Sequence, residues 1–422
     1  MSRTIMIGTA LFLLASTPLH AQTLTLADAL AKRAATSRTL KIAALDEQVA
    51  EEGVRLNRSG YLPKVDFQGG YTAQQAPQSI QVQQGSFETQ QADYGFFSSS
   101  LYQTLYDFGH TDARYERARA LRDASRFDYQ SKEQDLFLRT VASYFRILQG
   151  QKLLTAADEE VTQMSDHLRI ARDLFEQGVV TRNDLLQAEV RLASSRQRRL
   201  ETANRLENAW LDLNDQLGEP PEYRRELQEE TKIDLSALEM PAEKAVATRS
   251  ELKAQQKLLD AGEAEVRESR SGYYPEIFAK VGVDYVENDR VKEQAIMAAT
   301  VGLKLNLFDG YATTSRYRQA VQNRARAEEQ LMQMKSDLLL EYRTAANDAR
   351  VAKERIAVTE TSIRQGEENL RINRDRYQEQ VGTATEVLDA QTLLTQIRTD
   401  YYQAVFDFEV ALARVKRARG EL

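Results

Sequence analysis

The sequence Tyr377-Gln-Glu-Gln-Val-Gly-Thr-Ala-Thr-Glu-Val-Leu-Asp-Ala-Gln391 predicts a short turn between two long helices. Behind it, apolar residues recur at alternating steps of three and four, the seam of a left-handed coiled coil. The seam consists of Val387, Ala390, Leu394, Ile397, Tyr401, Ala404, Phe408, Ala411 and Val415. The incoming helix has a seam with a period of seven, at Ile356, Ile363, Leu370 and Tyr377. Two such helices, joined by a short glycine-containing turn, are expected to fold back as an antiparallel hairpin.

Composition and proline spacing narrow the class of protein. The chain has 422 residues and a net charge of -7, and an acidic chain lacks the basic face that nucleic acid binding needs. Of its seven prolines, none lies between Gln78 and Glu219 and none follows Pro275. Because proline is the strongest helix breaker, both windows can hold very long helices.

The first residues predict a signal peptide over residues 1–21. Arg3 supplies a positive charge, an apolar run extends from Ile5 to Ala15, and Leu19-His-Ala21 resembles a cleavage site. The alternative is a buried first helix, and the cleavage position itself stays open. The chain contains no cysteine, so we expect neither disulfides nor a cysteine-linked lipid anchor.

Three groups of residues occur twice in the same order. A six-residue motif stands at Arg58-Ser-Gly-Tyr-Leu-Pro63 and again, 212 positions later, at Arg270-Ser-Gly-Tyr-Tyr-Pro275. The other two groups recur 202 positions later: Tyr106-Asp107 with Arg114-Tyr115 as Phe308-Asp309 with Arg316-Tyr317, and Phe175, Asp184, Leu186 and Ala188 as Tyr377, Glu386, Leu388 and Ala390. Repetition at this period indicates one duplicated architecture rather than unrelated domains.

Each copy is expected to contain a helix, a strand pair and a long helix hairpin. The first repeat covers residues 22–217, with its strand pair in 64–106 and its hairpin in 111–217. The second covers residues 242–422, with strands in 276–307 and a hairpin in 312–419. Residues 218–241 contain three prolines and form the predicted linker. At 1.5 Å per residue, the longest helices would each span on the order of 100 Å.

The residues after each Ser-Gly-Tyr-x-Pro motif alternate between apolar and polar. The alternating segments are 65–73, 94–106, 277–285 and 297–307. A period of two predicts half-buried strands, and about ten residues is the length of a tilted transmembrane strand. A soluble two-stranded hairpin on a helical protein is the alternative.

Four strands cannot close a barrel by themselves, and an open sheet edge does not survive in lipid. Two protomers would give a barrel filled with side chains, whereas three would give twelve strands with room for a pore. The predicted fold is therefore mainly α with a small membrane β-barrel. Long antiparallel coiled-coil hairpins form an α-barrel, and four strands from each protomer form a twelve-stranded barrel in a trimer.

The first hairpin has a less regular seam than the second. The corresponding positions, from Leu185 to Leu213, are apolar at both ends but polar at Ser195, Arg199 and Thr202. This pattern predicts that the face is wet over part of its length. Arg196 and Arg198 crowd the same region, for which a solvated helix face is favoured over an anion site.

The order of signal peptide, duplicated helix, strand pair and long hairpin resembles the TolC-like outer membrane efflux proteins. The resemblance covers essentially the whole mature chain, and its most specific pieces are Leu305-Asn-Leu-Phe-Asp-Gly310 and Val387-Leu-Asp-Ala-Gln391. It implies a trimeric channel-tunnel in the cell outer membrane that extends into the periplasm. It also implies export with a periplasmic adaptor (membrane fusion) protein and an inner-membrane pump of the RND or ABC type, as in drug efflux and type I secretion.

The resemblance also implies roles for individual residues. Glu386 and Asp389 match carboxylates that ring the periplasmic constriction, and three copies would make a narrow acidic ring that favours cations. Asp184 and Tyr377 match positions of a closed-state lock between neighbouring helix pairs. The alternative for all four is ordinary helix N-terminal chemistry, because acidic residues are favoured in a first helical turn.

Both helix tips are implied to contact the adaptor, through Gly178 and Val179 at the first tip and Val381 and Gly382 at the second. The second tip departs from the family, because Gln380 stands where a small glycine is expected and no arginine lies in the tip. The detail of the gate therefore stays open.

No enzymatic function is predicted. The only histidines outside the predicted signal peptide, His110 and His167, are far apart, and no phosphate loop, nucleophile elbow or dinucleotide motif occurs. No cofactor or metal is expected. The competing interpretation is a soluble periplasmic coiled-coil scaffold or adaptor, which explains the hairpins but not the two strand pairs. The cargo, small molecules or proteins, stays open, although the missing cysteine argues mildly against the lipidated drug-efflux branch.

Overall fold

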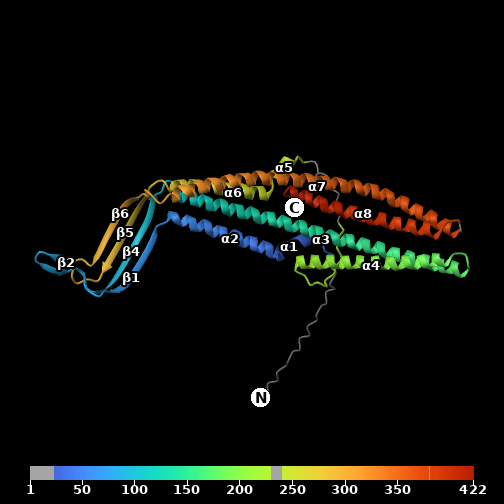
Figure 1. Ribbon diagram of the computed structural model, residues 1–422, viewed down its shortest axis with the longest axis horizontal. Coiled ribbons are helices and arrows are strands. Elements are labelled where there is room, and N and C mark those ends of the chain that lie inside the picture. Colours follow the sequence, from blue (N-terminus) through green and yellow to red (C-terminus); the bar gives the residue numbers. More distant parts are fainter. Residues whose placement is uncertain (1–22, 230–239, 380) are drawn as a thin grey trace, which may run out of the picture. The chain divides into compact units, whose positions relative to one another are not determined.

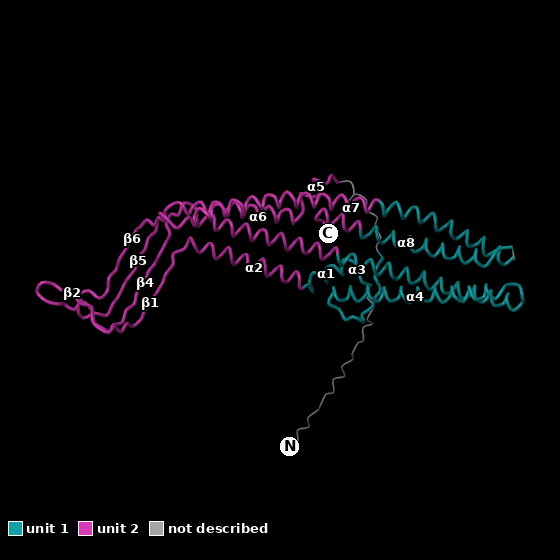
Figure 2. Tube along the Cα trace, in the orientation of Figure 1, with its two compact units in different colours: residues 1–37, 139–234, 351–410 teal, residues 38–138, 235–350, 411–422 magenta. Residues whose placement is uncertain are grey.

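The computed structural model describes residues 23–229, 240–379 and 381–422 (Figure 1). The predicted signal peptide, the middle of the predicted linker and Gln380 lie outside these ranges. The described chain is mainly helical, as predicted. The described residues group into two compact units, one of residues 23–37, 139–229, 351–379 and 381–410 and the other of residues 38–138, 240–350 and 411–422. Figure 2 shows that each unit combines parts of both sequence repeats.

The helices and strands follow the same order in both repeats. The helices are α1 (Leu26–Thr36), α2 (Arg38–Arg58), α3 (His110–Glu176), α4 (Arg182–Leu217), α5 (Ala242–Ala247), α6 (Ser250–Ser271), α7 (Ala312–Gln378) and α8 (Ala384–Ala418). The strands are β1 (Lys64–Ala73), β2 (Ser79–Val82), β3 (Gly85–Glu88), β4 (Asp93–Tyr106), β5 (Glu276–Val286) and β6 (Ala295–Lys304). A short 3-10 helix, η1 (Ser59–Tyr61), precedes β1. In the described residues, none of the helices has both the length and the apolar character to cross a membrane.

The two predicted hairpins are present, because α3 and α7 each run for 67 residues and are followed by α4 and α8. The helix that opens each repeat differs from the prediction. It is broken in both copies, at Ser37 between α1 and α2 and at Arg249 between α5 and α6. Hydroxyl side chains at the breaks bond to the preceding turn, from Thr36 to the Lys32 carbonyl and from Thr248 to the Ala245 carbonyl. Such bonds compete with helix continuation.

The four predicted strand segments form one antiparallel sheet in the order β1-β4-β5-β6. Two details differ from the sequence interpretation. The Gln-rich segment between β1 and β4 contains a second, two-stranded sheet of β2 and β3. The last strand ends at Lys304 instead of Leu307, because its partner β5 begins at Glu276, directly after Pro275, and offers nothing further to pair with.

The unit that contains the helix tips has an apolar core along the predicted seam. Six residues of α7 and α8, most of them on the predicted seams, form one cluster with α3: Leu370, Tyr377, Ala384, Val387, Ala390 and Leu394, packed against Ile170 and Leu174. In α4 the expectation of a wet seam is wrong at Ser195, which is fully buried and bonds to the Leu192 carbonyl. Arg198 and Arg199 stay partly exposed and form ion pairs with Glu160 and Asp158 on α3.

The unit that contains the sheet has a core of α5, α7 and α8. Its members are Ala245, Tyr342, Ala345, Ala349, Ala411, Leu412, Val415 and Ala418. Beside it lies an ion network, in which Arg249 pairs with Glu251 at 2.8 Å and with Glu341 at 3.2 Å. Arg417 also pairs with Glu251, so this carboxylate serves two buried guanidinium groups. Burial alone would raise the pKa of Glu251, but the two arginines lower it to about 2.

Candidate functional site

The pairing register gives the four-stranded sheet two chemically different faces. Rungs of directly opposed residues, such as Phe67, Ser99, Val283 and Met297, place the apolar positions of all four strands together. The apolar face carries Val65, Phe67, Gly69, Tyr71, Phe97, Ser99, Leu101, Ala279, Val281, Val283, Tyr285, Met297, Ala299, Val301 and Leu303. Met297 is 80% exposed and Phe67 74%. An exposed apolar surface of this breadth marks a contact with lipid or protein.

The opposite, polar face carries charged and hydroxyl-bearing side chains. It is formed by Lys64, Asp66, Gln68, Ser98, Ser100, Tyr102, Thr104, Glu276, Lys280, Asp284, Thr300 and Lys304. Period-two alternation in the sequence predicted this division for single strands. The register extends most of this division across the sheet. The exceptions include Phe96, Phe278 and Ile296, which lie on the polar face, and Gln103, which lies on the apolar face.

Aromatic side chains gather at both ends of the sheet. Toward the loops, the Phe97 ring lies 5.0 Å from Tyr285, and it also lies 6.3 Å from Phe67, which is nearer the middle of β1. At the helix end, Phe108 lies 4.7 Å from Tyr106 and 5.0 Å from Tyr274. Aromatic girdles flank the apolar band of outer membrane barrels. The sequence interpretation missed this pattern, since the rows form only when distant strands come together.

The helix end of the sheet is built twice from the same contacts. Asp107 accepts hydrogen bonds from the backbone and hydroxyl of Thr111, at 2.8 and 2.5 Å. Asp309 does the same for Thr313, at 2.9 and 2.7 Å, and these bonds lower the pKa of Asp309. Both carboxylates thus cap the N-terminus of a 67-residue helix.

The glycine of the repeated Ser-Gly-Tyr motif has a steric role at the same place. A Cβ added at Gly60 would lie 3.0 Å from the Thr111 methyl group, and one at Gly272 3.3 Å from the Thr313 methyl group. The following tyrosines pack edge-on against the partner helix, in the pairs Tyr61–Tyr115 and Tyr273–Tyr317. Two motifs that the sequence showed separately therefore form one joint in each repeat.

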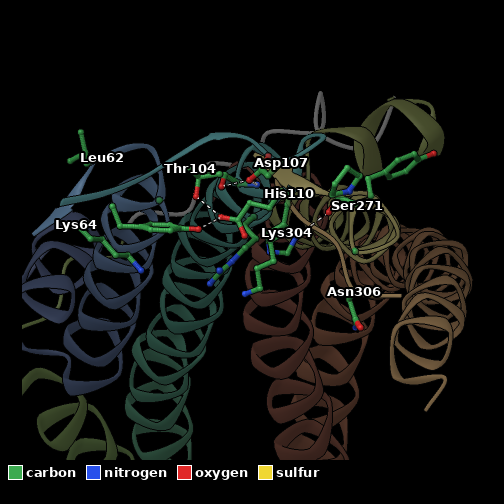
Figure 3. Close-up of a pocket in the computed structure, with 16 residues that line it drawn as sticks. Leu62, Lys64, Thr104, Asp107, His110, Ser271, Lys304 and Asn306 are labelled. Carbon is green, nitrogen blue, oxygen red and sulfur yellow. Dashed lines mark hydrogen bonds between the residues drawn. The ribbon is translucent and has the colours of Figure 1, made fainter. Parts of the chain in front are cut away.

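A pocket of about 380 Å³ opens on the polar face beside these joints (Figure 3). All four strands of the larger sheet contribute to its lining, through Lys64 of β1, Tyr102 and Thr104 of β4, Glu276 of β5 and Lys304 of β6. The Glu276 carboxylate accepts hydrogen bonds from the Tyr102 and Thr104 hydroxyls, both at 2.8 Å.

His110, one of the two histidines noted in the sequence, also lines this pocket. Its Nδ1 lies 3.0 Å from the Ser271 hydroxyl, which itself donates to the Glu268 carbonyl. Because the hydroxyl proton is used there, Nδ1 is the donor to Ser271. A structural hydrogen bond therefore accounts for this histidine. Throughout the described ranges, no group of three or more possible ligand side chains could hold a metal ion.

The two helix tips close with matching hydrogen bonds. Val179 donates to the Leu174 carbonyl and Val381 to the Arg376 carbonyl, each at 2.9 Å. Gly178 has φ +73°, the left-handed conformation that ends many helices. Gly382 is constrained by space instead, since a Cβ there would lie 3.1 Å from the Arg376 side chain. Val179 and Val381 are 48% and 67% exposed, so both tips present an apolar side chain to the outside.

Asp184 and Glu386 occupy the same position of a capping box. The Asp184 carboxylate accepts from the backbone of Thr181 at 2.9 Å, and Glu386 accepts from the backbone of Thr383 at 3.0 Å. In return, the threonine hydroxyl accepts from the backbone of each acidic residue at 3.3 Å. The helix N-terminal chemistry considered as the alternative is therefore present at both residues. Arg376 adds an ion pair to Glu386 at 3.8 Å.

Asp389 and Tyr377 differ in their exposure to solvent. Asp389 is exposed and forms no hydrogen bond or ion pair with the described part of the chain. Tyr377 is 7% exposed, its ring packs 5.7 Å from His167, and its hydroxyl has no hydrogen-bond partner among the described residues. Burial raises the pKa of Tyr377, with a further contribution from the Asp184 charge. The lock between Asp184 and Tyr377 stays a prediction.

A cavity of about 290 Å³ lies beside Tyr377 and was not foreseen from the sequence. Its lining includes His167, Gln391 and Arg374, with Arg374 donating to Gln391 at 3.1 Å. Burial lowers the pKa of His167, and the Arg374 charge lowers it further. This histidine is therefore a neutral packing partner of Tyr377.

Comparison with known proteins gives a consistent result. The profile of the family described as outer membrane efflux protein matches residues 29–219 and 242–421. The proteases secretion protein PrtF of Dickeya chrysanthemi is 24% identical over 393 residues, with 86% of this chain and 83% of the relative covered. The outer membrane protein TolC of Escherichia coli is 22% identical over 406 residues, with 91% and 79% covered.

Solved structures show the same fold. The outer membrane protein VceC of Vibrio cholerae superimposes with a TM-score of 0.84 at 16% identity, over 94% of this chain and 96% of that one. The outer-membrane channel OprN gives a TM-score of 0.83 at 18% identity, over 94% and 90% of the two chains. The names of these similar proteins describe channels and secretion proteins rather than enzymes.

Proposed function

The chain belongs to the outer membrane efflux protein family, and we propose that it works as a homotrimeric channel-tunnel. It is an outer membrane protein that extends into the periplasm and exports molecules from the cell. In the proposed assembly, three four-stranded sheets close one twelve-stranded barrel, and the long helix hairpins close a tunnel below it. The apolar face of the sheet contacts lipid, and the polar face lines the pore.

The sheet is the observation that carries this proposal. β1 and β6 are its two edges, and one face is apolar across all four strands. An edge in lipid leaves backbone groups unpaired, which costs several kcal/mol for each group. Pairing of β6 with β1 of the next copy removes both edges. Three copies supply enough strands for an open pore, whereas eight strands would be filled by side chains.

The tips are proposed to bind a periplasmic adaptor protein, which couples the channel to an inner-membrane pump of the RND or ABC type. The exposed Val179 and Val381, each beside a glycine, give both hairpins a small apolar contact point. At the same end, Glu386 and Asp389 are proposed to form the acidic constriction, and Asp184 and Tyr377 to take part in its closed state.

The cargo follows from the pump rather than from the channel. PrtF and the alkaline protease secretion protein AprF of Pseudomonas aeruginosa are both named for protease secretion. This similarity favours a secreted protein as cargo, with small molecules as the alternative. Deletion of the gene distinguishes the two. Loss of one or a few proteins from the culture medium indicates secretion, and increased drug sensitivity with an unchanged medium indicates efflux.

The deciding experiment is the native mass of the mature protein extracted in detergent from the outer membrane fraction. A trimer in that fraction, with heat-modifiable migration on a gel, is expected. A soluble dimer in the periplasmic fraction would overturn the proposal and would favour the coiled-coil scaffold.

A further inference from the structure

The charges on the polar face of the sheet are sorted along the strands. Lys64 and Lys280 share a rung, because each pairs with Tyr102, and Lys304 lies on the rung nearest the helices, opposite Glu276. The aspartates Asp66 and Asp284 lie on rungs further toward the loops. The helix end of the face is therefore rich in lysine, and the loop end carries the free carboxylates.

The three lysines Lys64, Lys280 and Lys304, named here the basic belt, are exposed. Within the described part of the chain they form no ion pair, although 33 ion pairs connect other residues. A surface ammonium group that lacks a partner keeps its full attraction for a mobile anion. The belt is therefore available to bind one.

The carboxylates nearest the belt are already engaged. Glu276 accepts two hydroxyl hydrogen bonds, and Asp107 accepts the backbone and hydroxyl of Thr111. Each carboxylate receives these bonds on one oxygen, Oε1 of Glu276 and Oδ2 of Asp107, and neither forms an ion pair with a lysine of the belt in the described part of the chain. Arg114 also lines the pocket and is partly balanced by Glu268, at 3.6 Å.

Figure 3 shows two lysines of the belt, Lys64 and Lys304, among the residues that line the pocket. Lys64 from one edge strand and Lys304 from the other both line the pocket, together with the amide of Asn306 and the hydroxyl of Thr104. The volume of about 380 Å³ admits a group as large as a phosphate or a carboxylate with its neighbouring atoms.

We propose that the basic belt binds carboxylate or phosphate groups of molecules that pass through the barrel. The inference rests on the proposed function, since it requires the polar face to line the pore. Edge-to-edge closure would bring Lys64 of one copy and Lys304 of the next to the same end of the barrel and complete a ring of ammonium groups. Rings of charged side chains select the ions that cross a pore.

The test measures how inorganic tripolyphosphate blocks the current of the purified full-length channel in planar bilayers. The double variant Lys64→Gln/Lys304→Gln should raise the half-blocking concentration by roughly tenfold, which corresponds to about 1.4 kcal/mol. The variant Lys64→Arg/Lys304→Arg keeps both charges, so tripolyphosphate should block it at nearly the same concentration as the wild type. At about 1 M salt the difference should disappear, because the Debye length falls to about 3 Å.

A matched control removes the same charge from helices at equivalent positions of the two repeats, through Lys41→Gln/Lys253→Gln. The half-blocking concentration of tripolyphosphate for this variant should equal that of the wild type. Equal block by the belt variant and the wild type, in channels of normal conductance, would overturn the inference and leave the proposed function intact. Absence of any trimer or channel would instead overturn the proposed function.

A second arm distinguishes a soluble anion from a lipid phosphate. Phosphorus in the purified protein is measured for the wild type and for Lys64→Gln/Lys304→Gln. Similar lipid phosphorus in both, together with weaker block, supports a site inside the pore. Loss of lipid phosphorus with unchanged block would mean that the belt holds a lipid headgroup, and the inference would fail.

Discussion

The two repeats break their first helix at the same point, but they fill the break differently. In the first repeat the buried residue is Ser37, whose backbone donates to the Arg33 carbonyl. In the second it is Arg249, which is 1% exposed and pairs with Glu251 and Glu341. The break itself follows from an Ala-Thr pair that recurs 212 positions apart, at Ala35-Thr36 and Ala247-Thr248.

The two breaks show which features the duplication retained. Capping residues and close glycine contacts occur in both copies, because they determine where helices begin, end and approach each other. The network of Arg249, Glu251 and Glu341 occurs in the second copy. In the first copy, the buried Glu219 side chain pairs instead with Lys32 and Arg225. The backbone design is therefore shared, and the two repeats place different ion pairs beside the break.

The largest effect is expected for Glu251→Gln. It leaves two buried arginines, Arg249 and Arg417, without their shared carboxylate, and loss of one partner of a buried pair costs about 3–5 kcal/mol. Glu341→Gln is the control, because Glu341 pairs with the same arginine but is 45% exposed, and it should cost under about 1 kcal/mol. The measurement is the temperature at which the detergent-solubilised protein loses helical circular dichroism. Equal shifts in unfolding temperature for both variants would contradict the larger contribution assigned to the shared, buried Glu251.

The same carboxylate predicts a pH dependence. The pKa of Glu251 is lowered from its ordinary value of 4.5 to about 2 in the folded chain, so its contribution is present above about pH 4.5 and is lost as the pH falls toward 2. After allowance for partial solvent screening, roughly 2 kcal/mol is expected. Unfolding of wild type and Glu251→Gln is compared at pH 6, 4 and 2.5. The gap between them should narrow with acid, and a constant gap would contradict the assignment.

A smaller effect is expected at the joint between helix and sheet. Gly60→Ala places a methyl group 3.0 Å from the Thr111 methyl, and we expect a loss of about 1 kcal/mol. The additional substitution Thr111→Ser removes that methyl and keeps the hydroxyl bonded to Asp107, so it should restore stability. Gly272→Ala, with 3.3 Å to Thr313, should cost less. A double variant no more stable than Gly60→Ala would exclude the steric explanation.

Much of the fold could be predicted because its signals are local and periodic. The seam behind Val387 and the long proline-free windows gave α3, α4, α7 and α8 to within a few residues. The helix breaks at Ser37 and Arg249 were not predicted, because a hydroxyl that bonds to the preceding turn leaves the apolar period of the sequence intact. The β2–β3 hairpin escaped as well, since four-residue strands inside a Gln-rich segment carry too short an alternation.

The candidate site was less accessible from the sequence. Asp184 and Glu386 were identified, but their capping boxes with Thr181 and Thr383 depend on backbone geometry that spacing only suggests. The basic belt could not be found, because Lys64, Lys280 and Lys304 come together only through the strand register. The residues of a seam or a turn follow one another in the sequence, whereas the residues of a charged surface come from several strands that are distant in the sequence.

The smallest effect separates the two carboxylates of the proposed constriction. Glu386 is held by the backbone of Thr383 and by Arg376, whereas Asp389 is exposed. Asp389→Asn should therefore raise single-channel conductance by roughly 1.5-fold and weaken block by multivalent cations, and Glu386→Gln should do less.

The double variant Glu386→Ala/Asp389→Ala should raise single-channel conductance and weaken cation block more than either single variant does. The reason is that it removes both carboxylates that these positions bring to the constriction. Asp400→Asn serves as the control for Asp389→Asn, since it also removes one charge from the same face of α8, about three turns further on. Conductance and block that stay at the wild-type level in the double variant would remove these residues from the gate. In that case the capping boxes alone would account for Asp184 and Glu386, and the acidic residues at both tips would be a feature of helix termini that the two repeats share.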